Sequence, residues 1–353
     1  MLKNLRRRVS GTTIAMWIIG LFLLTAVIYG TVRTLIAADY TSREWIDLFV
    51  YGISQGSVYA LIALGYTMVY GILRMINFAH GDVFMAGAFI GYFVATYFEK
   101  IGFLNQNWVL ALTAVMAIAA SGSAIIAILL ERIAYRPLRR APRLVPLITA
   151  IGASFFLEYS FLGLFGSGVK GFPQPDALSG RVMILGVPIL KSQVVVIVVS
   201  VIMLVALWLF VKRTKTGKAI QAVSEDKDAA ALMGINVDRS IMTTFLVGGA
   251  LAGVAGVLFA LLFRQVSFLM GFFPGLKAFT AAVLGGIGNI AGAMVGGLFL
   301  GIAESLFPNL VLSGLGIPAP YQLKDALAFL LLVLVLIFRP TGILGERLAT
   351  KKA

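Results

Sequence analysis

The chain has 353 residues, of which 60% are hydrophobic and 12% are charged, and Lys and Arg exceed Asp and Glu by 14. Soluble globular domains carry about 25% charged residues, so the composition excludes an ordinary water-soluble fold. The absence of cysteine and the single histidine exclude disulfides, thiolate nucleophiles and multi-histidine metal centres, so we expect no metal and no cofactor.

Apolar runs long enough to cross a membrane dominate the sequence. A bilayer core of about 30 Å needs roughly 20 apolar residues in a helix. Eight runs approach or exceed that length: 14–34, 45–73, 83–98, 108–133, 144–165, 193–211, 241–263 and 321–338. The predicted fold is an all-α polytopic membrane bundle with about eight full spans and a broken or re-entrant hairpin near residues 276–307.

The first run follows a basic segment with Lys3, Arg6, Arg7 and Arg8 and resembles a secretory signal. It is too long for one, and no small-residue cleavage site follows. We interpret residues 1–37 as an added anchor helix that precedes a transmembrane domain over residues 45–345.

The segment 77–82 interrupts the apolar pattern and carries Asn77, His80, Gly81 and Asp82. Asp82 directly precedes the run 83–98, so its favoured role is to cap the free amides of that helix. The competing interpretation is that this irregular segment lines a transport path. For His80 a packing role is favoured over a direct role in transport.

Three further ionisable residues fall within or beside the spans. Glu158 lies about 20 Å along its helix, where a carboxylate is costly unless it faces the bundle interior. We favour a bridge between two helices over contact with a substrate amine. Glu304 is expected as an interfacial charge near an outer helix end, and Lys277 either snorkels to the interface or neutralises a carboxylate.

Residues 212–240 form the longest loop on the basic side. Residues 212–218 resemble a phosphate loop, but Lys212 replaces its first glycine and Ala219 replaces the magnesium-binding Ser or Thr. Residues 219–235 then predict one short helix that stops at Gly234. It is either a solvated surface loop or a docking helix for a cytoplasmic motor subunit, with Ala229 and Ala230 small enough to enter a groove.

Gly285, Gly286, Gly288 and Asn289 interrupt the apolar stretch 276–307. Irregular backbone at membrane depth is tolerated only where protein or a water-filled cavity surrounds it. These residues are therefore candidates for the transport path. Glycines spaced four residues apart elsewhere favour close helix packing, and sliding surfaces remain an alternative. The pairs are Gly52/Gly56, Gly87/Gly91, Gly249/Gly253, Gly292/Gly296 and Gly297/Gly301.

The basic residues define the topology. Nineteen of the 29 fall in the N-terminal tail, in residues 131–143 and 212–240, and beyond residue 338. These segments share one side if the spans alternate, as the positive-inside bias requires. Both termini are thus expected in the cytoplasm, and the net charge is explained without nucleic acid.

Four motifs in order resemble one family. They are GSVYALIALG at 56–65, INFAHGD at 76–82, DAAALMGIN at 228–236 and LGGIGN at 284–289. Over about residues 45–345 the chain resembles branched-chain amino-acid ABC transporter permeases of the LivH type. Residues 1–34 depart from that pattern as an extra helix.

The resemblance implies a non-catalytic permease subunit of an importer in the bacterial inner membrane. Its partners would be a second related permease, two cytoplasmic ATPase subunits and a periplasmic or extracellular amino-acid-binding protein. The residues 225–235 would form the helix that contacts an ATPase subunit. Within that helix the candidates are Glu225, Asp228, Ala229, Ala230, Gly234 and Ile235.

Two other functions remain open at this point. Related permeases carry urea and short amides on a similar scaffold. A secondary transporter driven by an ion gradient would need intramembrane carboxylates, for which Asp82 and Glu158 give thin support. A membrane enzyme is disfavoured because paired catalytic groups are scarce.

Overall fold

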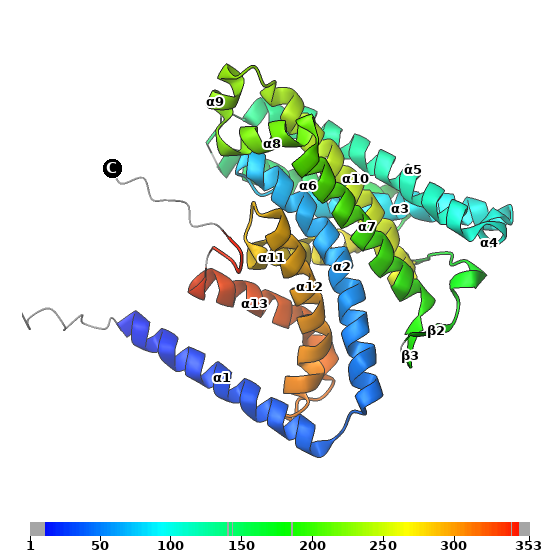
Figure 1. The fold of residues 1–353 in the computed structure, drawn as a ribbon, viewed down its shortest axis with the longest axis vertical. Coiled ribbons are helices and arrows are strands. Elements are labelled where there is room, and N and C mark those ends of the chain that lie inside the picture. Colours follow the sequence, from blue (N-terminus) through cyan, green and yellow to red (C-terminus); the bar gives the residue numbers. More distant parts are fainter. Residues whose placement is uncertain (1–10, 140, 143, 185, 340, 346–353) are drawn as a thin grey trace, which may run out of the picture.

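The computed structural model describes residues 11–139, 141–142, 144–184, 186–339 and 341–345. The basic N-terminal tail, Arg140, Arg143 and the basic residues beyond 345 lie outside this part. Within it, ten helices are long and apolar enough to span a membrane (Figure 1), which confirms the predicted polytopic bundle. They contain α1 (Gly11–Ala37), α2 (Ser42–Leu73), α3 (His80–Lys100), α5 (Trp108–Leu129), α6 (Leu144–Phe165), α7 (Lys191–Arg213), α10 (Val237–Phe263), α11 (Phe272–Gly285), α12 (Ile290–Phe307) and α13 (Lys324–Phe338). α11 and α13 reach that length only together with the short helices that precede them, in the spans Phe268–Gly285 and Pro320–Phe338.

Short elements lie at the two ends of the bundle. One end carries the helices α8 (Lys215–Glu225) and α9 (Lys227–Leu232), and the other carries the hairpin of β2 and β3, with α7 running between them (Figure 1). The strands were not predicted, because two to four residues give too short a pattern to detect. The remaining short elements are α4 (Phe103–Gln106), η1 (Leu130–Tyr135), η2 (Arg136–Leu138), β1 (Lys170–Gly171), η3 (Asp176–Leu178), β2 (Arg181–Ile184), β3 (Val187–Leu190), β4 (Gln265–Val266), η4 (Phe268–Met270), η5 (Pro308–Leu312) and η6 (Pro320–Leu323).

Two antiparallel strand pairs organise the end opposite α8. β1 pairs with β4 through Lys170 and Val266, and β2 pairs with β3 through Arg181 and Leu190. The pairing of β1 with β4 joins the segment after α6 to the segment after α10. It therefore holds two distant parts of the chain together outside the spans.

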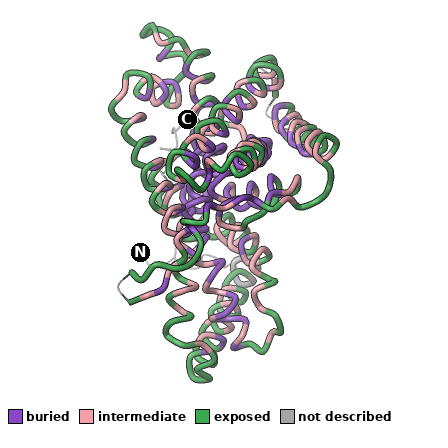
Figure 2. The backbone as a smooth tube through the Cα atoms, turned by 90° about the vertical axis from the view of Figure 1, so that its right-hand side faces the viewer, coloured by how far each residue is buried: buried purple, intermediate pink, exposed green. Residues whose placement is uncertain are grey.

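The most buried spans are those of α2, α10 and α11, followed by α3, whereas α1, α6 and α13 are mostly exposed. Figure 2 shows buried backbone gathered in the middle of the bundle and exposed backbone around it. The outer helices nevertheless carry large apolar side chains on their exposed faces, among them Trp17 and Phe156. This pattern is expected where the surrounding solvent is lipid.

Glycines bring the central helices into backbone contact. A side chain at Gly301 of α12 would collide with the backbone of Gly56 in α2, and one at Gly297 would collide with Ala60. A side chain at Gly87 of α3 would likewise meet Gly253 of α10. The interpretation of the spaced glycines as helix-packing surfaces is therefore confirmed for these pairs.

The predicted broken hairpin is confirmed. α11 ends at Gly285 and α12 begins at Ile290, and a four-residue break separates them. The two arms pack tightly beside the break, because a side chain at Gly285 would collide with the backbone of Gly292. The first arm spans 14 residues, or about 21 Å, so it is shorter than a bilayer core.

α1 packs on the rest of the chain through its second half. Its main contact is with η5, where Gly30 meets Val311 and Gly314 approaches the backbone of Gly30. The remainder of the described helix is largely exposed and extends away from the bundle (Figure 1). The role of α1, as a peripheral anchor or as a contact for a partner, stays a prediction.

Candidate functional site

The segment between α2 and α3 is irregular, as predicted, and it is held by a buried amide. Asn77 is 3% exposed, and its Oδ1 accepts a hydrogen bond of 2.5 Å from the Tyr135 hydroxyl. Tyr135 is the last residue of η1, which continues from the C-terminal end of α5. The contact therefore fixes this segment against a neighbouring span.

His80 begins α3 and packs closely on α2. A side chain at Gly65 would collide with the imidazole Nε2, and the Tyr66 ring meets the imidazole edge-on with centroids 4.9 Å apart. Among the described residues Nε2 has no hydrogen-bond partner. The surroundings of His80 are those of a tightly packed core side chain.

Asp82 does not cap α3, so the favoured interpretation of this residue is wrong. The helix begins two residues earlier, at His80, and its N-cap residue Ala79 makes no side-chain cap bond. The Asp82 carboxylate is 1% exposed, and its Oδ2 accepts a hydrogen bond from the Ser154 hydroxyl on α6. The other oxygen, Oδ1, faces Gly271 and has no partner among the described residues.

The start of α3 and the start of α11 meet at this point. A side chain at Gly81 would collide with the backbone of Gly271 and crowd Gly275. These glycines let the two helix ends approach with no side chain between them. Ser154 lies ten residues into α6, about 15 Å along its axis, so the contact is near mid-membrane.

A cavity of about 220 Å³ lies beside Asp82. Ser154 and Gly271, which flank the two carboxylate oxygens, both line it. Ile151, Phe155 and Phe272 also line the cavity and are about half exposed, so it opens on the side of the chain between α6 and α11. Its complete lining is Tyr66, Phe78, Ile151, Ser154, Phe155, Gly271, Phe272 and Leu276.

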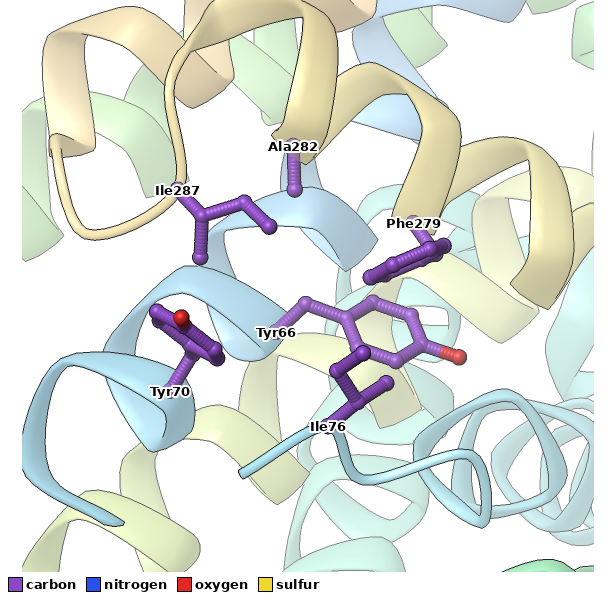
Figure 3. Close-up of a pocket in the computed structure, with 6 residues that line it drawn as sticks. All are labelled: Tyr66, Tyr70, Ile76, Phe279, Ala282 and Ile287. Carbon is purple, nitrogen blue, oxygen red and sulfur yellow. The ribbon is translucent and has the colours of Figure 1, made fainter. Parts of the chain in front are cut away.

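Aromatic rings separate this cavity from a second, water-sized space of about 10 Å³. The Phe279 ring lies 6.0 Å from both Tyr66 and Phe78, measured between centroids. Figure 3 shows Tyr66 and Phe279 on one side of the small space, with Tyr70 and Ile287 on the other. Tyr66 lines both spaces, and Phe279 packs against Tyr66 and Phe78. We call these three residues the aromatic partition.

The glycine break lies at the opposite end of α11 from the cavity. Gly286 and Gly288 adopt positive φ values of 108° and 98°, a region that favours glycine. Asn289 caps α12 by accepting a bond of 3.1 Å from the Gly292 amide, and it donates one of 2.8 Å to the Leu344 carbonyl. The chain near Leu344 therefore covers the break, and Gly285, Gly286, Gly288 and Asn289 do not line the 220 Å³ cavity.

Glu158 and Glu304 differ from expectation. Glu158 is buried one turn beyond Ser154 on the same face of α6, but no hydrogen bond or ion pair joins it to any described residue, so the expected bridge is not formed there. Glu304 is 2% exposed and not interfacial. It pairs with Lys277, which neutralises it and also contacts Asp325 at 2.5 Å.

The segment 212–240 contains two helices where one was predicted. Asp226 is extended, with φ of −149°, and its carboxylate accepts bonds from the amides of Asp228 and Ala229. It thereby ends α8 after Glu225 and starts α9. α9 ends before Gly234, the predicted stop, whose φ is +82°.

Ala230 cannot enter a partner's groove, because it is 4% exposed and packs inside this segment. Ala229 is exposed, as expected. The protruding side chains are Leu232 and Met233, which are 89% and 82% exposed. The sequence interpretation overlooked these two residues, although large apolar side chains beside charged ones outside a span are a detectable signal.

Cationic side chains surround the base of this segment. Arg74 donates a bond of 2.9 Å to the Ser224 carbonyl, and Arg139 pairs with Glu131 and Asp238. Partial burial lowers the pKa of Lys227, and the nearby charges of Arg139 and Arg74 lower it further. The exposed tip of α9 therefore stands beside a cluster of positive charge.

Comparisons with known proteins agree on one family. The family described as the permease component of branched-chain amino acid transport systems matches residues 48–336. The high-affinity branched-chain amino acid permease protein BraD of Pseudomonas aeruginosa is 43% identical over 86% of this chain and 96% of its own. Permease protein LivH of Escherichia coli is 42% identical over 84% of this chain and 94% of its own. A probable LivH of Methanocaldococcus jannaschii is 25% identical over 83% of this chain and 90% of its own. No solved structure matches the chain.

Proposed function

Because the chain belongs to the family of branched-chain amino acid transport system permease components, we propose that it forms the membrane path of an ATP-driven importer for leucine, isoleucine, valine or similar hydrophobic amino acids. The single observation that carries this proposal is the 42–43% identity to relatives named for that transport. The chain itself hydrolyses nothing, and ATP hydrolysis takes place in separate partner subunits.

The cavity beside Asp82 supports a path for a small solute. Its volume of about 220 Å³ is below the range of about 300–1,000 Å³ typical of drug-sized ligands. Most of its lining is apolar, and the aromatic partition closes it toward the inner side. A branched aliphatic side chain suits such a lining better than urea does.

The lateral opening of the cavity supports a second permease subunit. The half-exposed side chains of Ile151, Phe155 and Phe272 border the opening between α6 and α11. A path that opened sideways would leak solute into lipid. A related permease that covers this face completes the wall.

The chain is inserted in the bacterial inner membrane with both termini in the cytoplasm. The ten candidate spans, in which α11 counts together with η4, are an even number and so support termini on one side. α1 precedes the family match, which begins at residue 48. It serves as an added anchor whose loss leaves the transport domain of residues 45–345 intact.

Each of two ATPase subunits receives the coupling segment of one permease, formed here by α8 and α9. Leu232 and Met233 enter an apolar groove of the ATPase, because large exposed apolar side chains mark contact surfaces. The buried Ala230 stabilises the coupling segment by packing. The other residues that form the segment are Glu225, Asp228, Ala229, Gly234 and Ile235. An amino-acid-binding protein delivers the solute on the opposite side.

The double variant Leu232→Glu/Met233→Glu tests this proposal, because it places charge on the exposed tip without touching the buried residues. Met183→Glu is the matched control, since Met183 is 62% exposed on the β2–β3 hairpin at the other end of the molecule. We expect the double variant to lose co-purified ATPase and ATP-driven leucine uptake at least tenfold, and the control to retain both.

Three results would contradict the proposal. The first is normal ATPase retention and leucine uptake by the double variant. The second is isolation of the wild-type chain from native membranes without an ATPase. The third is gradient-driven uptake by the purified chain alone, which would identify a secondary transporter. Uptake of urea but not leucine by the wild-type complex would favour the urea permeases.

A further inference from the structure

We propose that Ser154 and Asp82 together bind the ammonium group of the amino acid as it passes through the cavity lined by α2, α6, α11 and the segment between α2 and α3. This inference rests on the proposed function, because it concerns the solute of that path. It assigns the polar end of the solute to two named side chains.

Asp82 provides the charge. The residue is 1% exposed, and its Oδ1 has no hydrogen-bond partner in the described part of the chain. A buried carboxylate oxygen without a partner costs free energy that a hydrogen-bond donor recovers. Oδ1 faces Gly271, which lines the cavity and has no side chain to shield it.

Ser154 provides the surface that the solute meets first. Ser154 lines the cavity, and its hydroxyl donates its single proton to Asp82 Oδ2. A hydroxyl has one donor and two acceptor lone pairs, so only acceptor capacity remains toward the cavity. That arrangement favours a donor group such as ammonium and disfavours a carboxylate.

The carboxylate of the solute would lie at the start of α11. No side chain caps this helix, and its first internal bond is the one of 3.1 Å from the Gly275 amide to the Gly271 carbonyl. The amides of Phe272 and Phe273 precede that bond and lie at the positive end of the helix dipole. The ammonium and carboxylate ends of an amino acid therefore find opposite partners near Gly271.

The rest of the cavity suits an aliphatic side chain. Phe78, Phe155, Ile151 and Leu276 line it and offer no charge. Glu158 lies one turn from Ser154 on the same face of α6 and adds negative charge toward the ammonium end. The arrangement therefore fits a zwitterion with a hydrocarbon side chain.

The competing explanation is that the bond from Ser154 to Asp82 only ties α6 to α3. Two substitutions separate these roles. Asp82→Asn keeps an oxygen that accepts the Ser154 proton but removes the charge, whereas Ser154→Ala removes the tie but keeps the charge. A structural tie predicts that Asp82→Asn is tolerated, and an ammonium site predicts that it is not.

The test uses the complete complex of permease pair, ATPase subunits and binding protein in proteoliposomes, with radiolabelled leucine as the probe. We expect Asp82→Asn to lower uptake at least tenfold and Ser154→Ala to lower it about tenfold, since each loses part of a charged contact. Ser154→Thr, which restores a hydroxyl, recovers uptake. Ser160→Ala is the control on the same helix, because the half-exposed Ser160 donates its hydroxyl proton to the Phe156 carbonyl of its own helix.

A second measurement does not depend on the binding protein. Leucine binding to the solubilised complex is challenged with 2-hydroxy-4-methylpentanoate, which replaces the ammonium group with a hydroxyl. We expect the wild-type complex to prefer leucine at least tenfold and Asp82→Asn to lose that preference. If Asp82→Asn does not assemble, the same loss in Ser154→Ala supports the proposal and its absence overturns it.

The results also distinguish this proposal from the proposed function. ATP-driven leucine uptake by the wild type, with unchanged uptake and preference in both variants, overturns the ammonium site and leaves the importer intact. Equal binding of leucine and the hydroxy acid by the wild type also overturns the ammonium site and leaves the importer intact. No ATP-driven leucine uptake by the wild type overturns the importer itself.

Discussion

Lys277 shows how a single cation stabilises the outer part of the bundle. It lies on α11 and pairs with Glu304 of α12 and Asp325 of α13, and Gln55 of α2 donates a bond of 3.1 Å to Glu304. A buried charge without a partner is costly in a membrane protein. The Lys277 ammonium group therefore joins three helices, and the Glu304 carboxylate links α2 to them.

We expect Lys277→Met to lower the free energy of unfolding by about 3 kcal/mol, the typical cost of removing one partner of a buried pair. Lys324→Met is the control, because within the described part of the chain Lys324 contacts only the Tyr321 hydroxyl at 3.3 Å and its ring. Thermal unfolding in detergent measures both. Equal midpoints for the two variants would contradict this role, and Lys277→Met/Glu304→Leu should recover part of the loss.

The positions of single polar residues were the least predictable feature of the sequence. Glu304 was assigned to an interface because it lies near a helix end, but α11 and α13 close over it. Asp82 is predicted as a cap because it precedes an apolar run, but the helix starts at His80 and the carboxylate meets Ser154 of α6 and Gly271. In both cases the decisive neighbour is distant in sequence, and hydropathy carries no information about it.

Whole elements were more predictable, since the length and apolarity of a run determine a membrane helix. The span 144–165 matches α6 residue for residue, and the break at 286–289 appears where glycine and Asn289 interrupt the pattern. The boundary between α8 and α9 was missed. Alanine-rich sequence predicted one helix, but the Asp226 carboxylate competes for the amides of the next turn.

The contact of α2 with α12 depends on glycine at the closest point of the two helices. We expect Gly301→Leu to destabilise the protein by at least about 3 kcal/mol, because the added side chain has only backbone to displace. Gly152→Leu is the control, since nothing lies near a side chain at that position on α6. Size-exclusion profiles after stepwise heating compare the two variants. Equal aggregation temperatures would show that the contact of α2 with α12 does not determine the stability of the protein.

At the scale of the whole molecule, the predicted alternation of spans is testable because the chain lacks cysteine. Single cysteines at Asp39, Ser179 and Ala231 place one label after α1, one near the hairpin and one in α9. All three positions are exposed. We expect an impermeant maleimide to label Asp39→Cys and Ser179→Cys in intact spheroplasts, and Ala231→Cys only after permeabilisation.

Labelling of Ala231→Cys in intact spheroplasts would reverse the orientation, and protection of Asp39→Cys alone would show that α1 does not cross the membrane.

The sequence predicts which runs cross the membrane but not which of their ends meet. The contact of the α3 start with the α11 start joins Gly81 to Gly271 and Gly275. Such a contact requires that two helices begin at the same depth in the membrane, and the hydropathy of each segment does not specify that depth.

The glycine contacts also limit how the molecule changes shape. Helices α2 and α12, and likewise α3 and α10, touch through backbone and cannot slide without steric collision. α6 borders the cavity, is mostly exposed and has few neighbours within the chain. A movement that alternately admits and releases a solute is therefore expected in α6. The helices that contact one another through glycine remain fixed relative to one another.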